Sequence, residues 1–133
     1  MLSSLDISAT GLEARRLWMN TIAENLANSE TTRDAAGRPI PYSRRQPTFA
    51  PQRVGNAIGV KVTDIQPDPT PAREVYQPGH PDADPVTGVV RMPNVNVVQE
   101  MVDMLVATRS YEANVTAMEA TKSMGGAALR ILA

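Results

Sequence analysis

The C-terminal third of the chain reads NVVQEMVDMLVATRSYEANVTAMEATKSMGGAALRIL from Asn96 to Leu132. It contains no proline, and its apolar residues recur with the spacing of one helix face. The first heptad series consists of Val97, Met104, Tyr111, Met118, Gly125 and Leu132. The second consists of Met101, Thr108, Val115, Lys122 and Leu129. The pattern predicts a helix over 96–132, about 55 Å long, whose seam faces another helix.

A second proline-free segment opens the chain. Its apolar stripe comprises Leu5, Leu12, Met19 and Leu26, with Ala9 and Ile22 between them. After Asn28 the residues are turn-like and poor in helix formers. These features predict a helix from about residue 4 to about residue 28, roughly 37 Å long.

The middle of the chain has a different composition, because all eleven prolines lie between Pro39 and Pro93. Proline inside a helix costs about 3 kcal/mol or more, so this part cannot be one long helix. Residues 59–65 alternate apolar and polar side chains, which predicts a half-buried strand. Weaker strand patterns cover residues 42–49, 74–76 and 88–92, and proline-rich turns separate them.

These segments predict an α+β, mainly helical fold in three parts. Residues 1–32 and 94–133 are expected to supply two long helices that pair as a coiled coil. Residues 33–93 are expected to form a small proline-rich β-hairpin or strand insert between them. Because the C-terminal helix is the longer one, part of its apolar surface is left over for neighbouring subunits.

Composition excludes several classes of function. The formal net charge is −1, so no bulk field favours nucleic acid or anionic lipid. One tryptophan, three tyrosines and one phenylalanine are too few for a base-stacking surface. The chain has no cysteine, which excludes disulfides and thiolate chemistry. The first residues lack the basic and apolar regions of a cleaved signal peptide, and no run of about 18 apolar residues predicts membrane insertion.

Catalytic motifs are missing from the sequence. The single histidine, His80, lies near Asp82 and Asp84 in a proline-bounded loop, where a solvated turn is a far better interpretation than a metal site. The glycines lack the spacing of a phosphate-binding loop or a nucleophile elbow. Arg44-Arg45 is interpreted as a solvated basic spot. We therefore expect no enzyme activity, no cofactor and no metal.

Several sequence strings resemble a known family. Residues 7–28, ending in Asn25-Leu26-Ala27-Asn28, resemble the opening signature of flagellar rod and hook axial proteins. Residues 75–84, residues 90–101 and Arg109-Ser110-Tyr111-Glu112-Ala113-Asn114 resemble the FlgC type of proximal-rod protein, and the likeness covers nearly the whole chain. Val89 stands where an aromatic residue is common, and Gly125-Gly126 interrupts an end that usually favours helix more strongly.

The resemblance implies a structural subunit of the flagellar basal-body rod. Such proteins pass unfolded through the flagellar type III export apparatus without a cleaved signal. They then polymerise helically with copies of themselves and other rod proteins, in the periplasmic space, into a hollow shaft that transmits motor torque. The motif positions expected to serve in packing or interfaces are Asn25, Leu26, Asn28, Met101, Arg109, Tyr111 and Asn114.

Two alternatives remain open at this point. One is a neighbouring axial rod component, against which the string from Pro78 to Glu100 argues. The other belongs to a different class, a soluble coiled-coil adaptor that binds one partner helix. An adaptor is expected to form a stable helical monomer or dimer, whereas a rod subunit has poorly ordered ends or forms a concentration-dependent polymer.

Overall fold

The computed structural model describes residues 2–133 and contains two long helices and four strands. In chain order the elements are α1 (Leu2–Ala27), β1 (Arg45–Val54), β2 (Ala57–Pro67), β3 (Arg73–Tyr76), β4 (Val89–Met92) and α2 (Val97–Leu132). The predicted α+β class and both predicted helices are confirmed, each helix within about two residues of its expected ends. Asn96 caps α2 by accepting a hydrogen bond from the backbone N–H of Gln99 at 3.2 Å.

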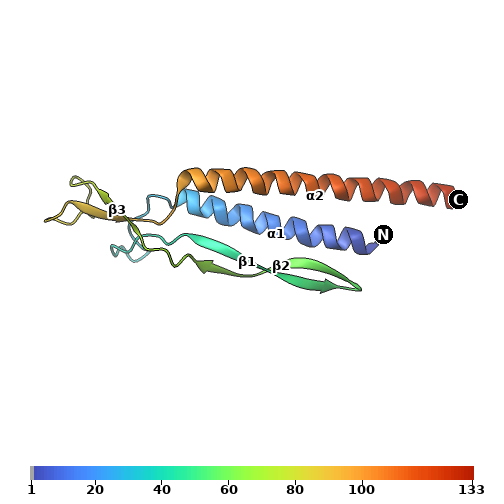
Figure 1. The fold of residues 1–133 in the computed structure, drawn as a ribbon, viewed down its shortest axis with the longest axis horizontal. Coiled ribbons are helices and arrows are strands. Elements are labelled where there is room, and N and C mark those ends of the chain that lie inside the picture. The colour runs from blue at the N-terminus through green and yellow to red at the C-terminus, as the bar shows by residue number, and fades with distance from the viewer. Residues whose placement is uncertain (1) are drawn as a thin grey trace.

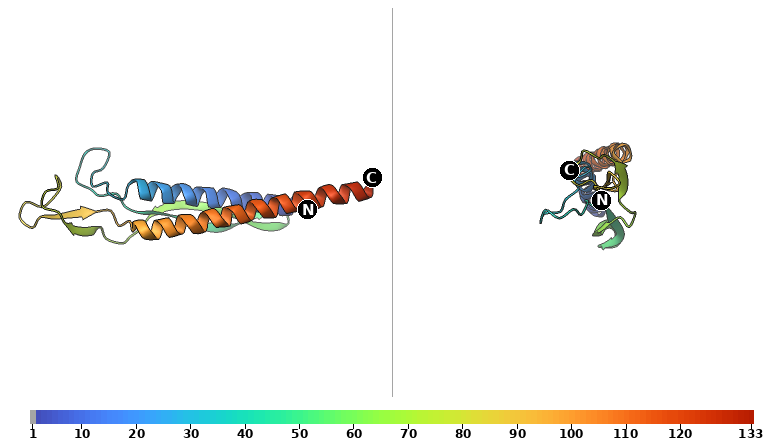
Figure 2. Two further views of the ribbon diagram at one scale, coloured as in Figure 1. Left: turned by 90° about the horizontal axis from the view of Figure 1, so that it is seen from above. Right: turned by 90° about the vertical axis from the view of Figure 1, so that its left-hand side faces the viewer.

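The molecule is elongated, and α1 lies between two partners (Figure 1). The helix α2 runs along one side of α1, and the β1–β2 hairpin runs along the opposite side. Both chain ends lie at one end of the molecule, while β3, β4 and their loops form the other end. The views in Figure 2 show the same narrow outline and show α2 projecting past the start of α1.

The two helices are antiparallel with one constant register. Near the loop end, Asn25 of α1 donates a hydrogen bond to Glu100 of α2. Farther along, a Cβ built on Gly11 would lie 3.2 Å from the Nδ2 of Asn114. The residue numbers of the two partners add up to the same total in both pairs, as they do in antiparallel helices that keep one register. By the same rule, Leu2 of α1 lies level with about residue 123 of α2. At about 1.5 Å per residue, α2 therefore extends about 13 Å beyond α1.

The seam of α2 is not the one expected from its most apolar residues. Met104, Tyr111 and Met118 of the first heptad series are half-buried, as predicted. The second predicted series is wrong at Met101, which is 59% exposed, and at Leu129, which is 69% exposed. The buried positions lie one residue earlier and carry small or polar side chains. They are Glu100 and Ala107, followed by the half-buried Asn114 and Thr121.

The strands β1 and β2 pair as one long antiparallel hairpin, and both are longer than the strands expected at residues 42–49 and 59–65. Their register pairs Arg45 with Pro67 and Val54 with Ala57, which leaves a two-residue turn at Gly55-Asn56. Gly55 has φ 61°, the positive value that the first position of a type II′ turn requires. Each strand of a two-stranded ribbon has a free edge, so the ribbon tolerates its prolines.

The hairpin packs closely against α1 at two places. Thr10 accepts a hydrogen bond from the backbone N–H of Val60 at 3.2 Å. Trp18 meets Phe49 edge to face, with ring centroids 6.4 Å apart. Gly59 permits this approach, because a Cβ added there would lie 2.4 Å from the Oγ1 of Thr10.

The hydrophobic core is small for a chain of this length. In the described residues, the buried apolar side chains are Ala14, Ile22, Val90, Met92, Val95 and Ala107. The chain exposes 9011 Å². A compact monomer of 14.3 kDa exposes about 6,800 Å², roughly a quarter less. The elongated fold thus leaves much of its surface without an internal partner. Within residues 2–133, neither helix combines the length and the apolar character needed to cross a bilayer.

Gly59→Ala is expected to destabilise the isolated chain by about 1–3 kcal/mol, because the new methyl group overlaps Thr10 and forces the hairpin away from α1. Gly126→Ala is the matched control. Nothing lies within 4 Å of the added Cβ there, and alanine favours helix by about 1 kcal/mol over glycine. Urea unfolding of both variants measures the difference, and an unchanged midpoint for Gly59→Ala would contradict the close approach.

Candidate assembly interface and its polar anchor

The buried amide of Asn25 joins three parts of the chain. Its Nδ2 donates to the backbone carbonyl of Arg45 at 2.8 Å and to the Oε2 of Glu100 at 3.1 Å. Its Oδ1 accepts from the backbone N–H of Arg45 at 2.9 Å and from the hydroxyl of Tyr42 at 3.0 Å. The side chain therefore makes four hydrogen bonds, the full capacity of an amide with two donors and two acceptor lone pairs.

Glu100 is fully buried on α2, and its charge is compensated by Arg44. The Nε of Arg44 donates to the Oε1 of Glu100, opposite the bond from Asn25. The same guanidinium reaches Asp68 at 3.2 Å and lies 3.8 Å from Asp103. Burial lowers the pKa of Arg44, but the hydrogen bonds and charges of Glu100 and Asp68 together outweigh it, so that the pKa is raised on balance. Arg44 therefore stays protonated.

Asn94 extends this cluster to the loop that follows β2. Its Oδ1 accepts from the backbone N–H of Arg44 at 2.7 Å, and its Nδ2 donates to the carbonyl of Thr70 at 2.8 Å. We call Asn25, Tyr42, Arg44, Asn94 and Glu100 the polar anchor. It fixes α1, α2 and the start of β1 to one another at the junction with the β3–β4 end.

The structure corrects the interpretation of Arg44-Arg45 as a solvated basic spot. Arg45 is exposed, but Arg44 is half-buried within the polar anchor. Glu100 was not predicted as a site residue, although it occupies the same helix face as Ala107 and Asn114. An acid at a seam position signals a buried partner, because a buried charge is tolerated only when it is paired.

Two other motif residues near the helix junction have local contacts. Leu26 is half-buried at the end of α1. Asn28 follows α1, donates to the carbonyl of Glu24 at 2.9 Å and accepts from the hydroxyl of Thr31 at 3.2 Å. The same carbonyl of Glu24 also accepts from the backbone N–H of Asn28 at 3.0 Å, so Asn28 is held at the C-terminal end of α1 through its backbone and its side chain.

The remaining motif residues lie on different faces of α2. Met101 is exposed on the side away from α1. Arg109 is also exposed, and its guanidinium lies 3.2 Å from the carboxylate of Glu112. Tyr111 is half-buried beside Leu12 of α1. Asn114 packs on Gly11, and its amide makes no hydrogen bond within residues 2–133.

A continuous apolar surface covers the first turns of α2 on its outward side. The head patch consists of Val98, Met101, Val102, Leu105 and Val106, all of which are exposed. Within residues 4–27, by contrast, α1 exposes no large apolar side chain. The surface available for assembly therefore belongs to α2 rather than to α1.

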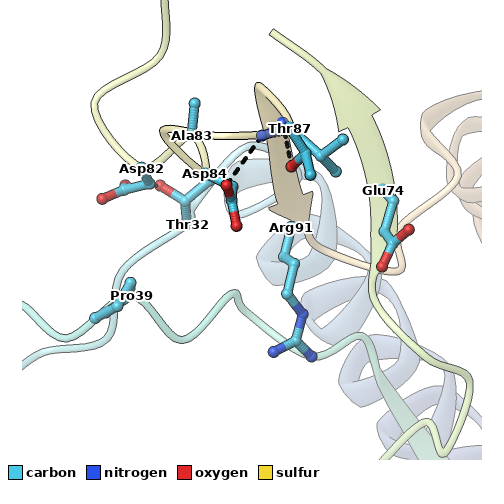
Figure 3. A pocket seen from close by; sticks show the side chains of 9 residues that line it. Thr32, Pro39, Glu74, Asp82, Ala83, Asp84, Thr87 and Arg91 are labelled. Carbon is cyan, nitrogen blue, oxygen red and sulfur yellow. Dashed lines mark hydrogen bonds between the residues drawn. The ribbon is translucent and has the colours of Figure 1, made fainter. Parts of the chain in front are cut away.

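The loop containing His80 is held by internal contacts, and Figure 3 shows the neighbouring pocket, in which Asp84 is hydrogen-bonded to the backbone of Thr87. Asp82 accepts from the hydroxyl of Thr32 at 2.7 Å and from the Nε of Arg33 at 2.8 Å. Asp84 accepts from the backbone N–H groups of Val86 and Thr87. The described residues contain no group of three side chains placed to hold a metal ion. Both carboxylates are thus engaged in shaping the loop.

The class of protein follows from comparison with known sequences. The family described as flagellar basal body rod FlgEFG protein C-terminal matches residues 86–131, which include β4 and nearly all of α2. The segment that carries Glu100, Ala107 and the head patch is therefore similar to the C-terminal part of flagellar basal-body rod proteins.

Full-length relatives narrow the assignment. The flagellar basal-body rod protein FlgC of Borreliella burgdorferi is 40% identical, covering 99% of this chain and 97% of its own. FlgC of Bacillus subtilis is 42% identical, covering 96% of this chain and 95% of its own. FlgC of Aquifex aeolicus is 41% identical, covering 93% and 91%. The chain belongs to the FlgC family of flagellar basal-body rod proteins, and it is a structural subunit of the rod, not an enzyme.

Asn25→Ala is expected to lower the free energy of unfolding by about 2 kcal/mol, because the buried Oε2 of Glu100 and the partly buried backbone groups of Arg45 lose their hydrogen-bond partner. Asn20→Ala is the matched control, since Asn20 is exposed on the same helix. Urea unfolding followed by circular dichroism measures both. Equal stability of the two variants would show that the polar anchor does not hold the helices.

The contact of Thr32 and Arg33, in the loop after α1, with Asp82, in the loop between β3 and β4, is expected to weaken in acid. Hydrogen bonds from Arg33 and Thr32 hold the pKa of Asp82 below its ordinary value of about 3.9. A lowered pKa in the folded state stabilises the fold above the unfolded pKa, and this contribution is lost as the pH falls through the folded value. Protection of the amides in residues 30–40, measured relative to their intrinsic exchange rate at each pH, should therefore fall below about pH 4.

Asp82→Asn is expected to show the faster amide exchange already at neutral pH and to lose the acid transition in that loop. Asp6→Asn, which changes an exposed carboxylate on α1, serves as the control and should retain the wild-type profile. An identical pH profile for Asp82→Asn and the wild type would rule out Asp82 as the titrating group.

Proposed function

We propose that this subunit polymerises helically, with copies of itself and with other rod proteins, into a hollow shaft that transmits motor torque. In this proposal residues 1–32 and 94–133 form a coiled-coil inner layer, and residues 33–93 form a separate β insert. The observation that carries the proposal is the outward head patch of α2, which is apolar and has no partner within the described chain. Apolar patches of this kind mark interfaces.

Torque transmission requires that the subunit not shear internally. The polar anchor supports this role, because it joins both helices and β1 through directional hydrogen bonds and a buried ion pair. Breaking one partner of such a pair costs about 3–5 kcal/mol. Relative sliding of α1 and α2 by one residue breaks these bonds together, so the anchor opposes sliding.

We further propose that the chain passes unfolded through the flagellar type III export apparatus, without a cleaved signal, and is incorporated in the periplasmic part of the basal body. The small core supports this view, since few buried side chains hold the isolated subunit together. Burial of the excess surface in the assembly then stabilises the folded form, so that folding is coupled to assembly.

The motif residues take two kinds of place in this proposal. Asn25, Leu26, Asn28 and Tyr111 are proposed to shape the helix pair from within. Met101 and Arg109 are proposed to contact neighbouring subunits, because both are exposed on α2. Asn114 is proposed to use its unengaged amide for a neighbouring subunit, since asparagine inside a helix is otherwise unfavourable.

The direct experiment replaces the native rod subunit of a motile bacterium with this chain. Basal bodies are then purified and imaged with the chain traced. The proposal expects the chain in the rod with both helices in the inner layer. A stable dimer that stays outside the basal body would instead support the adaptor.

Asn114→Ala is expected to reduce incorporation into basal bodies several-fold while the helical content of the purified chain stays the same or rises, because alanine favours helix. Asn20→Ala again serves as the control, since that residue is exposed on α1 and makes no hydrogen bond within residues 2–133. Quantitative immunoblotting of purified basal bodies measures incorporation. Wild-type incorporation of Asn114→Ala would remove Asn114 from the interface.

A further inference from the structure

The β1–β2 hairpin has the form that makes strand pairing between copies a hazard. It is a separate two-stranded ribbon, so each of its strands has one edge without a neighbouring strand. Its large apolar side chains Phe49, Ile58 and Ile65 are all exposed. An exposed edge of this kind is a template on which strands of other chains can add. The backbone N–H groups along the two edges therefore decide whether copies of the ribbon can join.

The prolines of the hairpin occupy one kind of position in its register. In an antiparallel ribbon, opposite residues alternate between pairs that exchange two backbone hydrogen bonds and pairs whose N–H groups point out of the ribbon. The register places each proline opposite a residue that has an N–H, namely Pro67 with Arg45, Pro47 with Ile65, and Pro51 with Val60. The direction of these three N–H groups shows which kind of pair each proline belongs to.

Two of the three N–H groups are bonded by side chains of α1. The N–H of Arg45 donates to the Oδ1 of Asn25 at 2.9 Å. Farther along the hairpin, the N–H of Val60 donates to the Oγ1 of Thr10 at 3.2 Å. Both N–H groups therefore point out of the ribbon. Because Arg45 is in β1 and Val60 is in β2, the hairpin turns a different edge to α1 at each of its ends, and the opposite edges face away from the helix.

The edges that face away from α1 are closed by other means. Pro67 of β2 and Pro51 of β1 have no N–H to offer there. Ile65, the outward residue of β2 before Pro67, donates its N–H to the Oδ1 of the adjacent Asp64 at 2.8 Å. The register also skips Thr63, and a bulge of this kind turns an edge away from an incoming strand.

The closed positions are spread along the whole ribbon. Apart from the bulge, every second residue points outward, namely 45, 47, 49, 51 and 53 in β1, and 58, 60, 62, 65 and 67 in β2. Proline or a side-chain acceptor removes the N–H at 45, 47 and 51 in β1, and at 60, 65 and 67 in β2. Within residues 45–67, neither strand therefore has two successive outward residues that both keep a free N–H.

We propose that the hairpin is closed to strand addition, so that copies of this chain do not pair through it and a neighbouring molecule meets the ribbon with side chains alone. The inference goes beyond the proposed function, because it concerns the free subunit as well as the assembled one. Closure matters for a chain with a small core, since a ribbon that adds strands draws partly unfolded copies into aggregates.

Pro51→Thr tests the β1 edge near the turn. It restores the missing N–H, so that the outward residues 49, 51 and 53 offer three donors in succession. The variant is expected to form strand-paired oligomers, followed by thioflavin T fluorescence, several-fold faster than the wild type. Gln52→Thr is the matched control, because it adds the same side chain to the same exposed strand at a residue whose N–H lies within the ribbon.

A second control separates the new N–H from the loss of a proline, which also changes the unfolded chain. Pro85→Thr removes an exposed proline outside the hairpin. Near-ultraviolet circular dichroism of Trp18, the single tryptophan, reports docking of the hairpin because its ring meets Phe49. A docked Pro51→Thr chain that pairs no faster than Gln52→Thr and Pro85→Thr would overturn the inference.

Asp64→Ala tests the β2 edge without touching a proline. It frees the N–H of Ile65, so that residues 62 and 65 offer successive donors, and it is expected to pair several-fold faster than the wild type. Asp64→Asn removes the same charge but keeps an Oδ1 that accepts this N–H, so it should behave as the wild type. Equal rates for Asp64→Ala and Asp64→Asn would overturn the inference, even where Pro51→Thr fails to dock its hairpin.

Discussion

The burial of one charged side chain organises this fold. Glu100 has no solvent contact, yet it lies at the seam between two helices where an apolar residue is usual. Its charge is tolerated because Arg44 and Asn25 each satisfy one of its oxygens. Neither partner is on α2, so the C-terminal helix cannot dock in its native place until α1 and the segment before β1 are there. The interaction makes the ends of the chain depend on its middle.

The face of α2 that packs against α1 carries small and polar residues, and this has an energetic consequence for the opposite face. Small and polar residues let α2 approach α1 closely at Ala107 and at the contact of Gly11 with Asn114. The larger apolar residues of the helix consequently face outward, where they contribute little to the stability of the single subunit. Such a subunit buries much of its apolar surface only when it associates. This suits a protein that is stabilised by becoming part of a larger structure.

The two helices and the strand pattern of residues 59–65 were predictable because period and proline placement act locally along the chain. The face of α2 that packs against α1 was not predictable. Heptad patterns select residues by hydrophobicity, so an acid such as Glu100 is assigned to the surface unless its buried partner is known. Arg44 is 56 residues away in sequence, and nothing local marks it as that partner. The hairpin was underestimated for a different reason. Pro47 and Pro51 argue against a strand, although a ribbon with free edges accepts them and Gly55-Asn56 is a recognisable hairpin turn.

The position of α1 between α2 and the hairpin restricts how its sequence can change. Two sides of the helix are occupied by different partners, so the solvent sees only a narrow strip along it. That strip includes Asp6, Ala9, Glu13, Arg16, Asn20, Ala23 and Ala27, spaced alternately by three and four residues. A fluorophore, an epitope residue or a new charge has room at these seven places without disturbing either neighbour. Between residues 5 and 26, the other side chains of α1 except the exposed Glu24 are buried or half-buried, so each must fit a helix on one flank or a ribbon on the other.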